Sequence, residues 1–206
     1  MKLQDLTIKE FLEKTYGKDP VPGGGSVSAL CGALAASLGE MVTALTIGRK
    51  KYVDVEEEMK IYAPKLENAR NAFLDFIDKD ADAYQKVFEA FKMPKETPAD
   101  IETRTAAIQE ATLEAALVPL SVAKKGVEIM PHIVEIGKKG NQNAVTDACV
   151  AVMCARTAVF GALLNVRINL SSLADKTKAD ELAKECDELQ GMAQKLESAL
   201  LNNIEL

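Results

Sequence analysis

The sequence predicts an all-α protein, a single-domain helical bundle without a sheet that spans residues 1–206. Aromatic residues make up only 5% of the chain and Trp is absent, while Ala and Leu are plentiful, which favours helices over a β-sandwich. No segment shows the strict polar–apolar alternation that marks a strand. Two long runs of small and apolar residues, 27–47 and 144–170, predict buried central helices with amphipathic helices around them.

The first predicted helix is short and amphipathic. The segment Thr7-Ile8-Lys9-Glu10 has the pattern of a capping box at its start. We expect this helix to turn Phe11 and Leu12 inwards and to end near Gly17. The first central helix follows after a loop and closes at Gly48.

The loop before the first central helix, PVPGGGS, combines two prolines with three glycines at residues 20–26. Gly23, Gly24 and Gly25 can adopt positive φ angles and let a ligand lie against the main chain. Ser26 is the expected N-cap of the helix. Free N–H groups and the positive end of the helix dipole predict an anion site at this junction. The pattern matches neither the Walker loop nor the dinucleotide-binding loop, and a triple glycine is also typical of a flexible turn.

The remaining helices are separated by polar turns. They are expected over about 54–92, 98–137, 144–170 and 175–202. Thr97 and Pro98 form a cap with proline at the first helical position. Pro64 predicts a bend in its helix, and Pro119 predicts a bend or a restart, because proline lacks the N–H group that a helix interior requires.

Charge and cysteine content exclude several classes of function. A net charge of −6 and a pI near 5.0 argue against a nucleic-acid partner. Four cysteines without a CxxC pair, and a single histidine, argue against a metal site. The absence of an apolar targeting segment predicts a cytoplasmic protein with reduced thiols. Residues 27–47 are long enough to span a membrane, but Glu40 and the abundance of Ala favour a helix buried in protein and no membrane contact.

Acidic residues on the helix over 54–92 are the main candidates for chemistry. Asp75, Asp78 and Asp82 share one face, which we interpret as solvated surface. Asp80 lies about 40° from Phe76 on the helical wheel, at or inside the edge of the apolar stripe. A carboxyl group at that position is a candidate for a raised pKa and for acid–base catalysis. The residues alone leave open whether Asp80 has this role or is also solvated.

Polar residues within apolar runs are candidates for ligand binding. Asn165 and Asn169 are one helical turn apart, so they either point into one pocket and hydrogen-bond a heterocycle or cap the end of their helix. Asn141 stands in a polar turn, where N-capping is the simplest interpretation. His132 has no obvious partner and is interpreted as a packing or surface residue.

A basic triplet, Arg49, Lys50 and Lys51, follows the first central helix. Cations at this position complement the negative end of the helix dipole. The alternative is a patch that binds the carboxylates of a substrate.

Five stretches of the chain occur in a specific combination: PVPGGGS with the small-residue helix after it, GRKKY, DKDADAY, FKMPKETP and FGALLNVRINL. Together they resemble the formiminotetrahydrofolate cyclodeaminase family, which also includes stand-alone methenyltetrahydrofolate cyclohydrolases. The resemblance covers nearly the whole chain in order. It implies an all-helical domain that forms a homodimer, with a folate site near the subunit interface.

The resemblance also implies an activity. The cyclodeaminase converts 5-formiminotetrahydrofolate to 5,10-methenyltetrahydrofolate with loss of ammonia, and the cyclohydrolase interconverts the methenyl compound and 10-formyltetrahydrofolate. Neither requires a metal or a tightly bound cofactor beyond the tetrahydrofolate substrate. In bifunctional members a formiminotransferase domain precedes this one, so we expect either a separate formiminotransferase or a cyclohydrolase role. The motifs favour the cyclodeaminase; a non-catalytic folate-binding dimer is the alternative of another class.

Site residues follow from the same resemblance. In the context D-A-x-A-aromatic, Asp80 rather than Asp78 resembles the acid–base aspartate of the cyclodeaminase. Such a carboxylate can take a proton from the attacking folate nitrogen and deliver one to the departing ammonia. The substrate-binding candidates are Gly23, Gly24, Gly25 and Ser26 for the pterin or the reacting carbon, Asn141, Asn165 and Asn169 as polar partners, and Arg49, Lys50, Lys51, Lys92 and Lys95 for the glutamate tail, which can carry several carboxylates.

Overall fold

The computed structural model describes residues 2–204, and within this range the chain forms six α-helices, three short 3-10 helices and no strand. The α-helices are α1 (Ile8–Thr15), α2 (Gly24–Thr46), α3 (Glu56–Lys92), α4 (Pro98–Lys139), α5 (Val145–Leu170) and α6 (Lys176–Leu201). The 3-10 helices are η1 (Leu3–Asp5), η2 (Lys50–Val55) and η3 (Gln142–Ala144). The predicted all-α class is confirmed.

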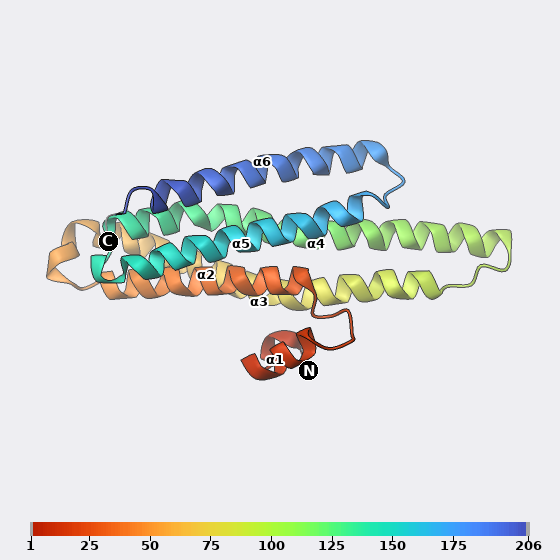
Figure 1. Ribbon diagram of the computed structural model, residues 1–206, viewed down its shortest axis with the longest axis horizontal. Helices are drawn as coiled ribbons and strands as arrows, with labels where there is room; N and C mark the ends of the chain where they lie inside the picture. The colour runs from red at the N-terminus through yellow and green to blue at the C-terminus, as the bar shows by residue number, and fades with distance from the viewer. Residues whose placement is uncertain (1, 205–206) are drawn as a thin grey trace.

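Helices α2 to α6 form an elongated bundle, and α1 stands apart from it (Figure 1). Helices α2 and α5 pack against each other, α3 packs on α2 and α4, and α6 covers α5 and α4. The far ends of α3 and α4 extend beyond α2 and α5 as a hairpin (Figure 1). The N-terminal end of α2 therefore lies near the middle of the molecule, beside the middle of α3.

Small residues bring the two central helices close to their neighbours. Ala29 and Ala36 of α2 and Ala151 of α5 are fully buried. Any side chain on Gly32 would overlap the ring of Phe73, which inserts from α3. Close packing of this kind requires glycine and alanine at the contact positions. The prediction of two buried central helices rich in small residues is confirmed.

The same two helices also carry an exposed apolar surface. By length and composition, Gly24–Thr46 and Gln142–Leu170 could each cross a membrane, and their most apolar windows are 50% and 44% buried in the bundle. The outward sides expose large apolar side chains, which we call the α2–α5 face: Leu34, Met41, Leu45, Val150, Met153 and Leu164. Each central helix thus packs into the core with one side and exposes an apolar stripe on the other.

Prolines do not interrupt the long helices. Helix α3 continues through Pro64, and α4 continues through Pro119, so the helix does not restart there. Because Pro119 has no N–H group, the carbonyl oxygen of Ala115 lacks its helical partner. The Nδ2 atom of Asn169 on α5 donates a hydrogen bond to that oxygen at 3.1 Å. A donor from another helix thus replaces the missing hydrogen bond.

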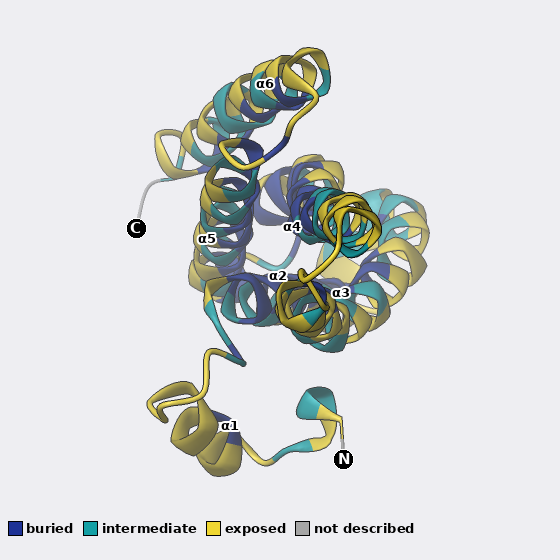
Figure 2. Ribbon diagram, turned by 90° about the vertical axis from the view of Figure 1, so that its right-hand side faces the viewer, coloured by how far each residue is buried: buried dark blue, intermediate teal, exposed yellow. Residues whose placement is uncertain are grey.

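Helix α1 has the predicted capping box, in which Thr7 and Glu10 exchange hydrogen bonds. It buries Phe11, but Leu12 is 59% exposed, so the expectation that both side chains point inwards is wrong for Leu12. The reason is the position of α1 outside the bundle, where little of its surface is covered (Figure 2).

Candidate active site

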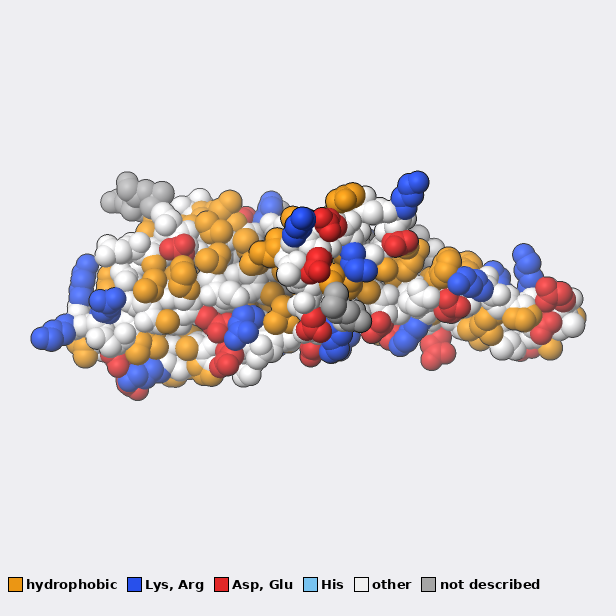
Figure 3. Space-filling model, turned by 90° about the horizontal axis from the view of Figure 1, so that it is seen from below, with side chains coloured by type: hydrophobic (Ala, Val, Ile, Leu, Met, Phe, Trp, Pro, Cys, Tyr) orange, Lys and Arg blue, Asp and Glu red, His pale blue; other side chains and the backbone are white. Residues whose placement is uncertain are grey.

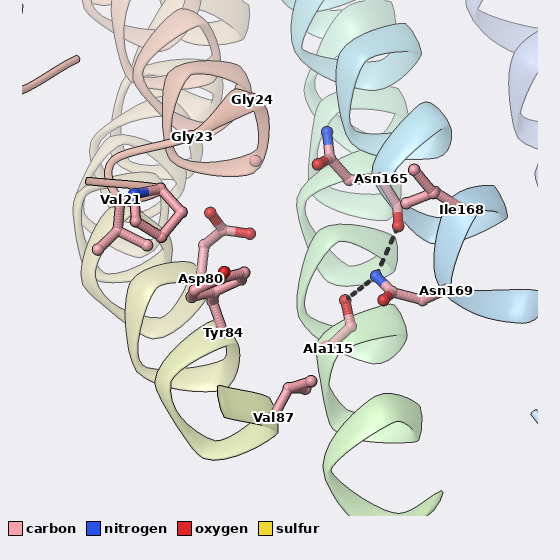
Figure 4. Close-up of a pocket in the computed structure, with 12 residues that line it drawn as sticks. Val21, Gly23, Gly24, Asp80, Tyr84, Val87, Ala115, Asn165, Ile168 and Asn169 are labelled. Atoms are coloured by element: carbon pink, nitrogen blue, oxygen red, sulfur yellow. Dashed lines mark hydrogen bonds between the residues drawn. The ribbon is translucent and has the colours of Figure 1, made fainter. Parts of the chain in front are cut away.

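A pocket of about 360 Å³ lies between the start of α2, the middle of α3 and the last turns of α5 (Figure 4). This volume lies in the range of small-molecule sites. Six of the predicted site residues line it: Gly23, Gly24, Gly25, Asp80, Asn165 and Asn169. The rest of the lining consists of Pro20, Val21, Tyr84, Val87, Ala115 and Ile168.

The Asp80 carboxylate is held against the N-terminal end of α2. Ser26 Oγ lies 2.9 Å from Asp80 Oδ2 and donates a hydrogen bond to it. Any side chain on Gly25 would overlap the carboxylate, so this close approach requires glycine. The group at this helix end is the protein's own Asp80 carboxyl, and the positive end of the helix dipole favours its ionised form.

Helix α2 begins earlier than predicted. Its N-cap is Gly23 and its first residue is Gly24, so the expectation that Ser26 is the N-cap is wrong. Glycine is one of the residues accepted at an N-cap, so the helix can start after Gly23. Ser26 then lies inside the first turn, and its hydroxyl points towards α3. Within residues 2–204 the only glycine with a positive φ is Gly48, at 76°. The three glycines thus permit close contact rather than an unusual backbone.

Burial raises the pKa of Asp80 above its ordinary value, and the hydrogen bonds with the Ser26 side chain and backbone oppose this shift. Ser26 Oγ also lies 3.0 Å from the carbonyl oxygen of Ile77. A hydroxyl has one proton and two acceptor sites. It can therefore donate to an ionised Asp80, or accept from a protonated Asp80 while it donates to Ile77. The site accommodates both states that an acid–base group must adopt.

Asn165 and Asn169 form the opposite wall of the pocket (Figure 4). Asn165 Nδ2 donates to the carbonyl oxygen of Gly161 at 2.8 Å. Asn169 Nδ2 donates to the carbonyl oxygens of Ala115, at 3.1 Å, and of Asn165, at 2.9 Å. Within residues 2–204 neither amide oxygen accepts a protein hydrogen bond. The structure places both residues in one pocket, where their oxygens can accept from the N–H groups of a heterocycle.

The basic triplet lies at the other end of α2, about 33 Å from Gly24 at about 1.5 Å per helical residue. There Arg49, Lys50 and Lys51 line a second, open pocket of about 320 Å³ together with Tyr52, Asn141 and Asn143. The structure of one chain therefore does not bring Arg49, Lys50 or Asn141 to the Asp80 pocket.

Asn141 has the predicted capping contacts. Its Oδ1 atom accepts from the backbone N–H of Asn143 at 3.1 Å, and its Nδ2 atom donates to the carbonyl oxygen of Leu45 at 3.0 Å. The bond to Leu45 joins η3 to the end of α2. Asn141 thus shapes the second pocket.

Lys92 is also outside the Asp80 pocket. It lies twelve residues after Asp80, at the end of α3, a rise of about 18 Å. Its Nζ atom is 3.0 Å from the Glu89 carboxylate and 4.0 Å from the centre of the Phe88 ring. Lys95 is exposed in the loop that follows.

Asp78 does not belong to a solvated face, contrary to the prediction. Its carboxylate accepts from the backbone N–H of Leu3 at 2.6 Å and from Gln4 Nε2 at 2.7 Å. It thereby fixes η1 against α3, a contact between segments far apart in the sequence. Asp75 and Asp82 are exposed, as predicted.

Sequence reasoning missed the apolar part of the pocket wall. Tyr84 and Val87 follow Asp80 by four and seven residues on α3, so the helical repeat could have identified them. Ile168 lies directly before Asn169 on the same helix. Ala115 comes from α4, and no local pattern connects it with the pocket.

Comparison with known proteins identifies the family of the chain. The sequence model of the family described as "Formiminotransferase-cyclodeaminase" matches residues 7–188. A methenyltetrahydrofolate cyclohydrolase of Methylorubrum extorquens is 37% identical over 198 residues, which are 96% of this chain and 95% of that protein. A formimidoyltransferase-cyclodeaminase of Rattus norvegicus is 35% identical over 173 residues, which are 84% of this chain but 32% of that protein. The chain thus spans about a third of the rat relative.

The fold is also known from a solved structure. The crystal structure of formiminotetrahydrofolate cyclodeaminase from Thermotoga maritima matches with a TM-score of 0.83 and 30% sequence identity, and the match covers 98% of both chains. The family match covers most of the chain, and the relatives named above are enzymes. The chain therefore belongs to the formiminotransferase-cyclodeaminase family, a family of enzymes of folate one-carbon metabolism.

Proposed function

We propose that the protein is a cyclodeaminase that converts 5-formiminotetrahydrofolate to 5,10-methenyltetrahydrofolate and ammonia. One observation carries the proposal: the partly buried Asp80 faces two asparagine amides across a pocket (Figure 4). The amide oxygens suit the N–H groups of a pterin, and the apolar side chains of Val87 and Ile168 suit its flat faces. The pterin would then lie with its reacting nitrogens near Asp80.

The proposed reaction needs one group that both accepts and donates a proton. The folate nitrogen N10 attacks the cationic formimino carbon, a carbon–nitrogen bond forms, and Asp80 takes the N10 proton. The bond from that carbon to the amino nitrogen then breaks, and Asp80 returns the proton to the departing ammonia. The substrate and the methenyl product carry the same positive charge, which an ionised Asp80 offsets. This sequence of steps requires no metal and no redox cofactor.

A second candidate function is the cyclohydrolase reaction. The match to the Methylorubrum extorquens protein over 95% of its length favours it. In this reaction water adds to the methenyl carbon and gives one proton to Asp80. The bond from that carbon to N5 then breaks, N5 takes the proton of the new hydroxyl, and 10-formyltetrahydrofolate remains. The same carboxylate serves both reactions.

The absorbance band of methenyltetrahydrofolate distinguishes the candidates when the two substrates are offered separately. Growth of the band from 5-formiminotetrahydrofolate supports the cyclodeaminase. Loss of the band from added methenyltetrahydrofolate, faster than the spontaneous rate and without activity on the formimino compound, supports the cyclohydrolase. Absence of both activities from folded protein would contradict the proposal.

We also propose that the protein acts as a homodimer and that a formiminotransferase supplies the formimino substrate. The α2–α5 face supports the dimer, because large apolar side chains exposed along two neighbouring helices are typical of an interface. Figure 3 shows hydrophobic side chains gathered over the half of the molecule that α2 occupies. Light scattering should give twice the chain mass of 22.3 kDa. A monomer at assay concentrations would contradict the dimer.

A further inference from the structure

We propose that Pro119, a buried residue of α4 behind the pocket wall, fixes the Asn169 amide with its oxygen towards the pocket, and that this oxygen selects folates whose pterin ring carries an N–H group at N8. Pro119 is then a positioning residue that acts through the carbonyl group of Ala115. This inference rests on the proposed function, because that function assigns the pterin to the Asp80 pocket. It goes further by naming the oxidation state of the ring that the pocket accepts.

The first observation is that the protein itself uses both hydrogens of the Asn169 amide. A carboxamide has two N–H donors and one oxygen acceptor. Asn169 Nδ2 donates at 3.1 Å to the carbonyl oxygen of Ala115 and at 2.9 Å to that of Asn165. Figure 4 shows the two bonds meeting at this nitrogen. The amide therefore presents its oxygen Oδ1, an acceptor, to a ligand in the pocket.

The second observation concerns the origin of the bond to Ala115. In an uninterrupted helix the N–H group of residue 119 would donate to this carbonyl oxygen, but Pro119 has no N–H group. If the Asn169 amide turned over, Oδ1 would face two carbonyl oxygens, and the partly buried oxygen of Ala115 would lose its donor. Pro119 therefore favours the orientation in which the amide oxygen is free for a ligand.

Asn165 is not fixed to the same degree. Within residues 2–204 its Nδ2 atom donates to one acceptor, the carbonyl oxygen of Gly161 at 2.8 Å. One N–H group of this amide is thus still available, so Asn165 can either donate to a ligand or accept from it. The strict requirement for a donor on the ligand comes from Asn169.

The third observation is that Asn169 lies across the pocket from Asp80 (Figure 4). In a pterin, N5 and N8 are at opposite corners of one ring. The proposed reaction places N5, which bears the formimino group, near Asp80, so N8 points to the opposite wall. A tetrahydropterin carries an N–H group at N8, which can donate to Asn169 Oδ1. The fully oxidised ring has a lone pair at N8 instead.

This arrangement discriminates through the ligand that it rejects. An oxidised ring would set its N8 lone pair against Asn169 Oδ1, and the amide has no free N–H group to offer in exchange. A site built to hydrogen-bond one group of a substrate rejects an analogue without that group, because the protein atom is left unpaired. The pocket should therefore accept reduced folates and exclude oxidised ones.

Side-chain NMR tests the fixed amide without a folate. In wild type labelled with nitrogen-15 asparagine, the Asn169 amide is identified by its absence from Asn169→Ala. In Pro119→Ala the new N–H group at position 119 can bond to Ala115, so the Asn169 amide protons should exchange with solvent about fivefold faster. The control is Pro131→Ala, at an exposed position about 18 Å farther along α4, which should leave this exchange unchanged.

Calorimetric binding tests the selection at N8. The probes are tetrahydrofolate and 8-deazatetrahydrofolate, in which a CH2 group replaces N8–H and the ring stays saturated. Wild type and Pro131→Ala should bind tetrahydrofolate at least tenfold more tightly. Pro119→Ala should reduce this ratio about fivefold, and Asn169→Ala should bring it close to one.

Kinetics distinguish a positioning role from a catalytic one. Pro119→Ala should raise KM for 5-formiminotetrahydrofolate about fivefold. It should leave kcat and its pH dependence close to the wild-type values, since Asp80 keeps its hydrogen bond with Ser26. A lower kcat with an unchanged KM would contradict the positioning role.

The outcomes separate the two proposals. Equal affinity of wild type for the two probes would overturn the selection at N8. Amide exchange and an affinity ratio that Pro119→Ala leaves unchanged would overturn the role of Pro119. In both cases an active enzyme would still support the proposed function. A wild type that shows the affinity ratio but converts neither folate would contradict the proposed function and leave the inference intact.

Discussion

The carboxylate of Asp80 lies directly against the main chain of Gly25, in space that the Cβ atom of any other residue would occupy. This contact joins α2 to α3 at the point where the pocket forms. It explains the glycine at position 25, because the absent side chain makes room for the group that we propose to be catalytic.

Gly25→Ala should therefore displace Asp80 and reduce kcat/KM by about 100-fold, because small displacements of reacting groups have effects of this size. Overpacking should also lower the free energy of unfolding by about 1–3 kcal/mol. Steady-state kinetics and urea denaturation measure the two effects. The control is Gly191→Ala on α6, where a Cβ atom would meet nothing within 4 Å. It should keep its activity and gain about 1 kcal/mol of stability. Equal activity of the two variants would contradict this role of Gly25.

Ser26→Ala should move the pH dependence of the reaction. The Ser26 hydroxyl stabilises the ionised form of Asp80 and so lowers its pKa. Its removal raises that pKa further, and the limb of the pH profile that requires ionised Asp80 should shift to higher pH. The measurement is kcat/KM as a function of pH for both proteins. A limb that stays in place or moves to lower pH would show that the Ser26 hydroxyl does not lower the pKa of Asp80.

Asp80→Asn should make stability less dependent on pH. Burial raises the pKa of Asp80 in the folded state above its unfolded value of 3.8. The unfolded chain then loses this proton first as the pH rises, so Asp80 destabilises the wild type progressively between the unfolded and the folded pKa. The difference in unfolding free energy between the variant and the wild type should increase across that interval and stay constant above it. Urea denaturation over a pH series tests this; a difference that decreases with pH would contradict it.

Asn169 should stabilise the protein through its hydrogen bond to the Ala115 carbonyl group, which has no helical donor because Pro119 lacks an N–H group. Asn169→Ala removes the donor to Ala115 and should cost about 1 kcal/mol. With Pro119→Ala an N–H group at position 119 can bond to Ala115, and the cost of Asn169→Ala should then decrease. A double-mutant cycle in urea measures this coupling. Equal costs in the two backgrounds would show that the two residues are independent.

Local patterns identified candidates for much of the site, and the family resemblance selected Asp80 among them. The position of Asp80 at the edge of an apolar stripe and the spacing of Asn165 and Asn169 both follow from the helical repeat, and all three residues line the pocket. The role of Ser26 could not be predicted in this way, because it depends on a helix that starts three residues earlier. The contact of Asn169 with Ala115 joins residues that are 54 positions apart, and only the packed bundle brings them together.

Helix length explains why the other predicted binding residues lie elsewhere. The chain places Arg49 just after a helix that begins at Gly24, so the two ends of α2 cannot meet within one subunit. A sequence pattern identifies the basic cluster but not the surface that it faces.

Single-turnover formation of the methenyl band from 5-formiminotetrahydrofolate, in wild type and in Asp80→Asn, tests the central claim most directly. The variant keeps the shape of the side chain and loses only its ability to exchange a proton. We predict that the rate decreases by about 100- to 10,000-fold while the affinity for the folate changes little. Circular dichroism establishes that the variant is folded. A folded variant that forms the band at the wild-type rate would show that Asp80 is not the acid–base group.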